Sequence, residues 1–166
     1  MNTMGKWLWL VAAVGLVLHG EAAELCGKVV KVSDGDTITL LCESNLLERI
    51  RLDRIDAPEK SQPFGKRAKE HLSKLVFGKF VTVRYDKRDR YGRILGIVML
   101  KDQEVNLSMV RDGYAWHYSY FNHTQEYSAA ETEARAARKG LWTQKDPVNP
   151  YQWRKGIRGD TPRISQ

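Results

Sequence analysis

The chain has 166 residues, a length typical of one domain, and it carries a net charge of +7. A positive balance attracts polyanions and speeds their arrival, so nucleic acid is one class of partner that the charge suggests. Two cysteines are too few for a zinc site, and the sequence contains no Walker loop, GxSxG elbow or HExxH run, which argues against those classes of enzyme.

The first 23 residues predict a cleaved signal peptide. Lys6 gives a positive start, the twelve residues Trp7–Leu18 are apolar or small, and small residues at Ala22 and Ala23 suit the cleavage site. Such a helix spans about 18 Å, which is short for a bilayer core of about 30 Å. We therefore expect an exported protein, periplasmic or secreted, with no stable membrane association after cleavage. A short membrane anchor or a buried N-terminal helix is the alternative.

Residues 25–55 have a pattern typical of β-strands. Two runs rich in β-branched residues, Lys28–Val32 and Thr37–Leu41, flank the pair Asp34-Gly35, which is the strongest short-range signal of a β-hairpin. A third strand follows, in which apolar and polar residues alternate. Its polar residues, all on one face, are Arg49, Arg51 and Asp53.

The later sequence predicts an amphipathic helix that ends at Gly78, then two strands and two further helices. The strands are Lys79–Tyr85 and Arg93–Leu100, the second bent at Gly96, and the helices are Asn106–Arg111, with Asn106 as N-cap, and one around 127–137. Five strands with a helix between the third and fourth predict an α+β, mainly β fold: a five-stranded OB-type barrel with about three packed helices. We expect this domain to span residues 24–145 and residues 146–166 to form a peripheral basic tail.

Cys26 and Cys42 lie symmetrically about Asp34, so they could face each other across the first hairpin. An exported protein can form disulfides. The bridge would close fifteen intervening residues and add about 3 kcal/mol to the free energy of unfolding in the chain-entropy model. We predict this disulfide; two free cysteines buried in strands are the alternative.

Three acids can converge at one end of the barrel: Asp36 at the edge of the hairpin, and Asp56 and Glu59 after the third strand. Carboxylates without partners repel one another, and a hard divalent cation, which takes oxygen ligands, would relieve the repulsion. The structural alternative is that Asp36 serves only the turn and that Asp56 and Glu59 cap a loop.

Two arginines favour the functional interpretation. Arg51 precedes Asp56 by five residues on the same extended segment, and Arg93 precedes the buried strand. A planar guanidinium suits a phosphate and stays charged. Phosphodiester hydrolysis requires a metal that polarises the phosphoryl oxygen, a base that orients water, and positive charge near the transition state. A surface ion pair is the alternative for each arginine.

Three stretches carry a family resemblance. They are Asp34-Gly35-Asp36-Thr37, then Arg51-Leu52 followed by Ile55-Asp56-Ala57-Pro58-Glu59, and then Asp89-Arg90-Tyr91-Gly92-Arg93. In this order and combination they resemble the thermonuclease (staphylococcal-nuclease-like) family, over residues 26 to about 145. The resemblance implies a Ca²⁺-dependent endonuclease that cuts DNA and RNA, prefers single strands and leaves 3′-phosphate ends.

The resemblance also assigns roles by position. Asp36 and Asp56 would bind Ca²⁺, with the carbonyl of Ala57 as a further ligand. The family commonly has Thr at the position of Ala57, so any hydroxyl role is lost here. Glu59 would act on the attacking water as general base.

On the substrate side, Arg51 and Arg93 would contact the phosphate. Tyr118 and Tyr120 lie in the region where the family places tyrosines that stack on a nucleotide, and Tyr91 would line the groove. Stacking tolerates any base and contributes about 1–3 kcal/mol per base, which suits a nuclease of broad specificity. Packing of these aromatic residues in the core is the alternative.

Two other functions stay open on the sequence. One is a non-catalytic OB module that binds nucleic acid, and the other is an exported binding partner of another protein. The complete set of acids and arginines favours the enzyme, which we expect to be a monomer. An all-oxygen site would also accept Mn²⁺ or Mg²⁺. The four histidines are assigned no catalytic role.

Overall fold

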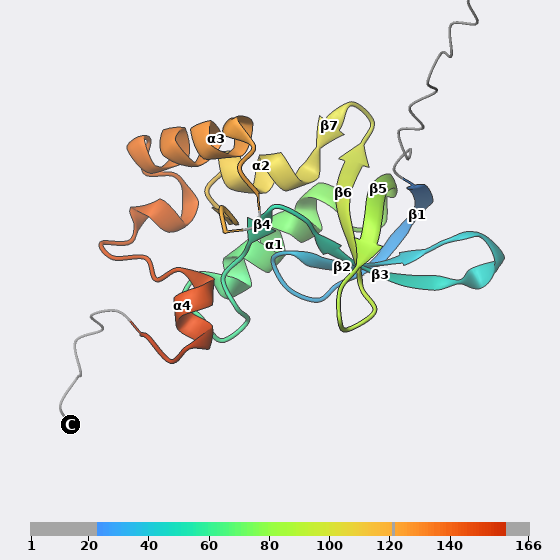
Figure 1. The fold of residues 1–166 in the computed structure, drawn as a ribbon, viewed down its shortest axis with the longest axis horizontal. Helices are drawn as coiled ribbons and strands as arrows, with labels where there is room; N and C mark the ends of the chain where they lie inside the picture. Colours follow the sequence, from blue (N-terminus) through green and yellow to red (C-terminus); the bar gives the residue numbers. More distant parts are fainter. Residues whose placement is uncertain (1–22, 121, 159–166) are drawn as a thin grey trace, which may run out of the picture.

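The fold is built around a β-barrel, seen in a computed structural model that describes residues 23–120 and 122–158. Its strands are β1 (Ala23–Val32), β2 (Thr37–Leu41), β3 (Leu47–Leu52), β5 (Phe80–Arg88) and β6 (Ile94–Leu100). They pair in the order β3-β2-β1-β5-β6, and parallel pairing of β3 with β6 closes the barrel. Figure 1 shows the barrel on the right, with α3 and α4 on the left. The predicted five-stranded α+β barrel is confirmed; the predicted signal peptide lies outside the described residues except for Ala23, which begins β1.

Apolar side chains that alternate along the strands fill the barrel. The fully buried ones include Val29, Ile38, Leu40, Ile50, Val83 and Val98. Residues between them face outward, as the two-residue period of a strand requires. A second, smaller apolar cluster consists of Trp116, Ala134, Leu141 and Trp142.

Helices and short elements connect and cover the barrel strands. The helices are α1 (Gly65–Val76), α2 (Val105–Arg111), α3 (Gln125–Ala136) and α4 (Pro150–Arg154), with 3₁₀ turns η1 (Glu43–Asn45) and η2 (Gly140–Thr143). Two-residue strands are β4 (Ile55–Asp56), β7 (Gln103–Glu104) and β8 (Trp116–His117). β4 pairs with β8, so the segment after the third barrel strand is held against the segment that leads to α3. Within the described part of the chain, no helix combines the length and apolar character needed to cross a membrane.

A β-bulge in β1 changes the register of the first hairpin. Val29 pairs with Leu40 and Lys31 with Thr39, so one residue of β1 has no counterpart in β2. The added residue places Gly27, whose Cβ would lie 3.1 Å from the Cys42 sulfur, beside Cys42. Cys26 is exposed, and both cysteines are free thiols in the structure. The predicted disulfide is therefore not formed here.

Gly96 and Asn106 fix the end of β6 where the barrel closes. A Cβ on Gly96 would lie 2.3 Å from the Val83 side chain, so only glycine allows the two strands to approach there. The buried Asn106 side chain accepts a hydrogen bond from the Val98 N–H (2.9 Å) and donates to the Gly96 and Asp53 carbonyls (3.0 and 2.9 Å). The prediction that Asn106 caps α2 is wrong, because the helix begins one residue earlier. The Asn106 side chain instead joins β6 to the turn between β3 and β4.

Candidate active site

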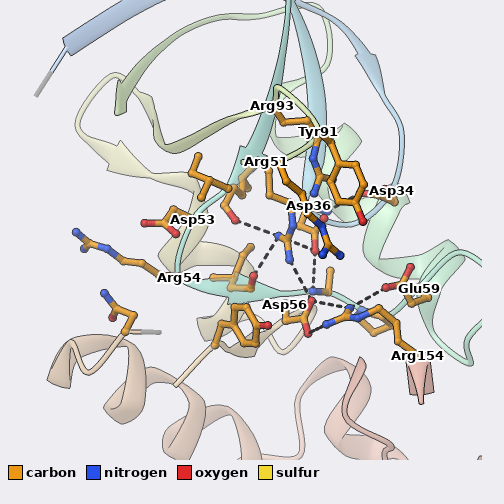
Figure 2. Close-up of a pocket in the computed structure, with 18 of the residues that line it drawn as sticks. Asp34, Asp36, Arg51, Asp53, Arg54, Asp56, Glu59, Tyr91, Arg93 and Arg154 are labelled. Carbon is orange, nitrogen blue, oxygen red and sulfur yellow. Dashed lines mark hydrogen bonds and ion pairs between the residues drawn. The ribbon is translucent and has the colours of Figure 1, made fainter. Parts of the chain in front are cut away.

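A cavity of about 580 Å³ opens at the end of the barrel where β2 begins and β3 ends. All three predicted acids, both predicted arginines, Tyr91 and Tyr118 line it. Further lining residues that the sequence interpretation left out include Asp53, Arg54, Lys87, Arg90 and Arg154. Figure 2 shows Arg51 directed toward Asp36 and Asp56, and Arg154 directed toward Asp56 and Glu59, while Asp53 and Arg54 lie apart from this cluster.

The tight turn between β1 and β2 positions Asp36. Asp34 accepts a hydrogen bond from the Asp36 N–H (3.1 Å), and Gly35 packs so closely on Ala57 that a Cβ at Gly35 would lie 2.7 Å from the Ala57 Cβ. The Asp36 carboxylate in turn accepts the Ala57 N–H at 3.0 Å. The turn and the segment after β4 are thus tied together, which brings the first signature stretch against the second.

Burial concentrates negative charge in this corner. Desolvation and repulsion by Asp36 raise the pKa of Asp34 to about 6. Burial also raises the pKa of Asp56, although Arg154 and Arg51 oppose the shift. Each carboxylate is therefore costly to ionise here without added positive charge.

Arg51 joins the two aspartates. Its guanidinium lies 2.8 Å from Asp36 and 3.0 Å from Asp56, and it also donates to the Leu52 and Ile55 carbonyls, both at 3.1 Å. The β2–β3 register places Thr37 opposite Arg51, which explains why Asp36 is its neighbour. Burial lowers the pKa of Arg51, but Asp36 and Asp56 outweigh it, so the pKa is raised and the side chain stays charged.

Glu59 stands apart from the Arg51 cluster and binds another arginine. Arg154, in α4, donates to Glu59 at 2.7 Å and to both oxygens of Asp56 at 3.1 and 2.9 Å. The prediction of a purely peripheral tail is therefore wrong for residues 150–154, whereas residues 159–166 lie outside the described ranges. A helix-start signal was present in the sequence, because Asn149 caps α4 and Pro150 occupies its first turn.

Arg93 lies on the other wall of the cavity. Its guanidinium is 2.7 Å from Asp89, and the Asp89 carboxylate also accepts the Tyr91 and Arg93 N–H groups at 2.9 and 3.0 Å. Tyr91 is largely exposed, and its ring centroid lies near two guanidiniums, those of Arg90 (4.9 Å) and Arg93 (5.5 Å). This loop therefore presents an aromatic ring and positive charge beside the acids.

The remaining predicted aromatic residues occupy different places. Tyr118 lines the cavity, and its N–H donates to the Arg54 carbonyl at 2.8 Å. Tyr120 is 72% exposed and does not line the cavity; its ring contacts Tyr118 (6.5 Å between centroids) and Tyr151 of α4 (5.4 Å). Tyr120 is thus not packed in the core, which the sequence left as an alternative.

The carboxylates that contact Arg51 are oxygen donors, the type of ligand that a hard divalent cation takes. Among residues 23–120 and 122–158, no group of three or more His, Cys, Asp or Glu side chains is in position to hold a metal. Asp36 and Asp56 both contact the Arg51 guanidinium. Glu59 does not contact Arg51; it binds Arg154, which also binds Asp56. Ca²⁺ and Mg²⁺ both accept a coordination shell of two carboxylates that is completed by backbone carbonyls and water.

Comparison with known proteins places this chain in a family. Residues 49–144, more than half of the chain, match the sequence profile described as "Staphylococcal nuclease homologue". A protein of Escherichia coli named "Uncharacterized endonuclease" is 48% identical over 133 residues, which cover 80% of this chain and 86% of that protein. A protein of Haemophilus influenzae with the same name is 45% identical over 128 residues, covering 77% and 72%. "Micrococcal nuclease" of Shigella flexneri is 38% identical over 164 residues, covering 92% and 94%. The chain belongs to the staphylococcal nuclease homologue family.

Proposed function

We propose that this nuclease is an exported, monomeric, Ca²⁺-dependent endonuclease that hydrolyses DNA and RNA, prefers single strands, and leaves 3′-phosphate and 5′-hydroxyl ends. The observation that carries the proposal is the convergence of Asp36 and Asp56 on Arg51, with Glu59 and Arg93 on the walls of the same cavity. One cavity thus contains two acids that could bind a cation, a third carboxylate that could act on water, and arginines that could bind a phosphate.

Asp36 and Asp56 would hold the cation, with the Ala57 carbonyl as a further oxygen. When bound, the cation supplies Lewis-acid polarisation of the phosphoryl oxygen. Within the described part of the chain, the ion pairs of the buried Asp36 and Asp56 are with arginines. This supports the assignment, because desolvated negative charge favours a bound cation.

Glu59 would accept the proton of the attacking water. Its side chain is 40% exposed, so it reaches both solvent and the cavity, as a base that activates water must. Attack forms a P–O bond and breaks the bond from phosphorus to the 5′ oxygen, which then takes a proton from water. Arg93 would bind the phosphate as charge develops on it.

A strand of unpaired bases is the substrate that the exposed rings favour. Tyr91 and Tyr120 are both largely exposed at the cavity or close to it, and stacking on such rings requires bases that are free of a duplex. The net charge of +7 supplies attraction for the phosphate backbone without a preference for sequence. A non-catalytic binding module would use the same surface, but it would not need Glu59.

Glu59→Gln separates catalysis from binding. The amide keeps the shape of the side chain but cannot accept a proton, so turnover on single-stranded DNA should fall by about 10²-fold or more. Binding of the same strand, measured by fluorescence anisotropy, should remain within a few-fold. Glu126→Gln, an exposed change at the start of α3 away from the cavity, is the matched control and should leave both unchanged. Full turnover in Glu59→Gln would overturn the assigned role.

A further inference from the structure

The contact between α4 and the acids joins residues far apart in the sequence. Arg154 and Asp56 are separated by 98 positions, yet Arg154 grips both Asp56 oxygens and also one oxygen of Glu59. In Figure 2 the Arg154 guanidinium points between the two carboxylates. Among the hydrogen bonds and ion pairs of the described residues, those of Arg154 alone link Asp56 to Glu59.

Several contacts hold α4 in this position, so Arg154 is not a freely moving surface side chain. Before the helix, the Gln62 amide donates to the Val148 carbonyl at 2.6 Å, which fastens the tail to the loop after Glu59. Asn149 caps the helix by accepting the Tyr151 N–H at 2.9 Å. The Tyr151 ring then packs against Tyr120, with 5.4 Å between centroids.

The Asp56 carboxylate already accepts three hydrogen bonds from arginines, so a cation that binds it competes with these N–H groups. Its oxygens receive one N–H from Arg51 and two from Arg154, and its side chain is 1% exposed. Arg51 is itself 14% exposed and is fixed by two backbone carbonyls, whereas Arg154 is 39% exposed and lies near the chain end. A cation that coordinates Asp56 should therefore displace Arg154 before it displaces Arg51.

We propose that Arg154 sets the affinity of the site for its divalent cation by competing with that cation for Asp56, while it also holds Glu59. This inference rests on the proposed function, because it takes Asp36 and Asp56 as the cation ligands. Without the cation, Arg154 of α4 contacts Asp56 and Glu59. With the cation bound, Arg154 releases Asp56, and α4 loses these hydrogen bonds to the domain.

Binding linkage makes the competition reciprocal. If Arg154 weakens cation binding by some factor, the cation weakens the Arg154 contact by the same factor. Cation binding should consequently expose the tail, which contains tryptic cleavage positions at Arg154, Lys155 and Arg158. These two effects are measured independently of nuclease activity.

Isothermal titration of Ca²⁺ into the full mature chain tests the proposal. Arg154→Gln removes the competing charge, and Arg154→Lys keeps a charge but loses the two-pronged contact with Asp56. Arg84→Gln is the control, because Arg84 is a mainly exposed arginine of β5 whose recorded ion pair is with Glu24, so it removes the same charge away from the site. Trypsin digestion of the wild type with and without Ca²⁺ gives the reciprocal measurement.

We expect Arg154→Gln to bind Ca²⁺ about fivefold or more tightly than the wild type, Arg154→Lys to fall between them, and Arg84→Gln to stay within twofold of the wild type. Ca²⁺ should also speed tryptic release of the wild-type tail. Equal or weaker Ca²⁺ binding by Arg154→Gln, with the wild type still binding Ca²⁺, would overturn this inference and leave the proposed function intact. No Ca²⁺ binding by any variant would instead overturn the proposed Ca²⁺ site, and this inference with it.

Discussion

Arg51 lies 2.8 Å from Asp36 while it also binds Asp56, so one guanidinium holds together an acid from the β1–β2 turn and an acid from β4. The same arginine donates to the backbone carbonyls of Leu52, which ends β3, and of Ile55, which begins β4. The geometry of the acids therefore depends on Arg51, in addition to any contact it makes with a phosphate.

Arg51→Ala should be strongly destabilising. Removal of one partner of a buried ion pair leaves uncompensated buried charge, which costs about 3–5 kcal/mol in the free energy of unfolding. Arg49→Ala, at an exposed position of the same strand, should cost less than about 0.5 kcal/mol. Urea denaturation of the two variants without metal measures the difference. Similar stabilities would show that Arg51 does not hold the acids in place.

Asp89 should stabilise the fold in a pH-dependent manner. Burial opposes its ionisation, but hydrogen bonds from the Arg93 side chain and from the Arg93 and Tyr91 N–H groups outweigh it, so the pKa of Asp89 is lowered. Its contribution is therefore present above the ordinary pKa of about 3.9 and is lost as the pH falls through the lowered folded pKa.

Asp89→Asn tests this pH dependence by denaturation between pH 7 and pH 2. The stability gap between the wild type and Asp89→Asn should be full at neutral pH and should shrink below about pH 4. Asp86→Asn, at an exposed position nearby, should change stability by less than about 0.5 kcal/mol throughout. A gap that grows on acidification would contradict the assigned direction.

Gly96→Ala should strain the closure of the barrel. The new methyl group would meet the Val83 side chain at 2.3 Å, and such overpacking costs about 1–3 kcal/mol. The double variant with Val83→Ala should be more stable than the sum of the two single effects, because the shorter side chain makes room. Thermal denaturation of the four proteins in this cycle measures the coupling, and simple additivity would argue against the close approach.

The sequence predicts the centre of the site well because short-range rules determine it. A hairpin turn places Asp36 beside the strand that carries Arg51, and Asp56 follows on the same segment, so local pairing is enough to bring them together. The barrel follows in the same way from alternation and from a glycine at a crowded strand crossing. Glu59 also lines the cavity as expected, but nothing local indicates that its carboxylate binds another arginine.

The failures have longer-range causes. Arg154 reaches Asp56 across 98 positions, and the tail's composition resembles that of a solvated basic segment. The hairpin is centred on Gly35, because Val32 pairs with Ile38, whereas the predicted pairing of Cys26 with Cys42 assumed a centre at Asp34. Asn106 has the residue type of a helix cap, and only the closed barrel offers it three buried backbone partners.

Cleavage of single-stranded DNA by the purified protein, followed with Ca²⁺ and then with excess chelator, tests the central claim most directly. The account predicts cleavage that requires Ca²⁺, stops on chelation and returns when Ca²⁺ is restored, with 3′-phosphate ends in the products. Cleavage that continues unchanged in the chelator, or binding without cleavage at every divalent metal tried, would contradict it.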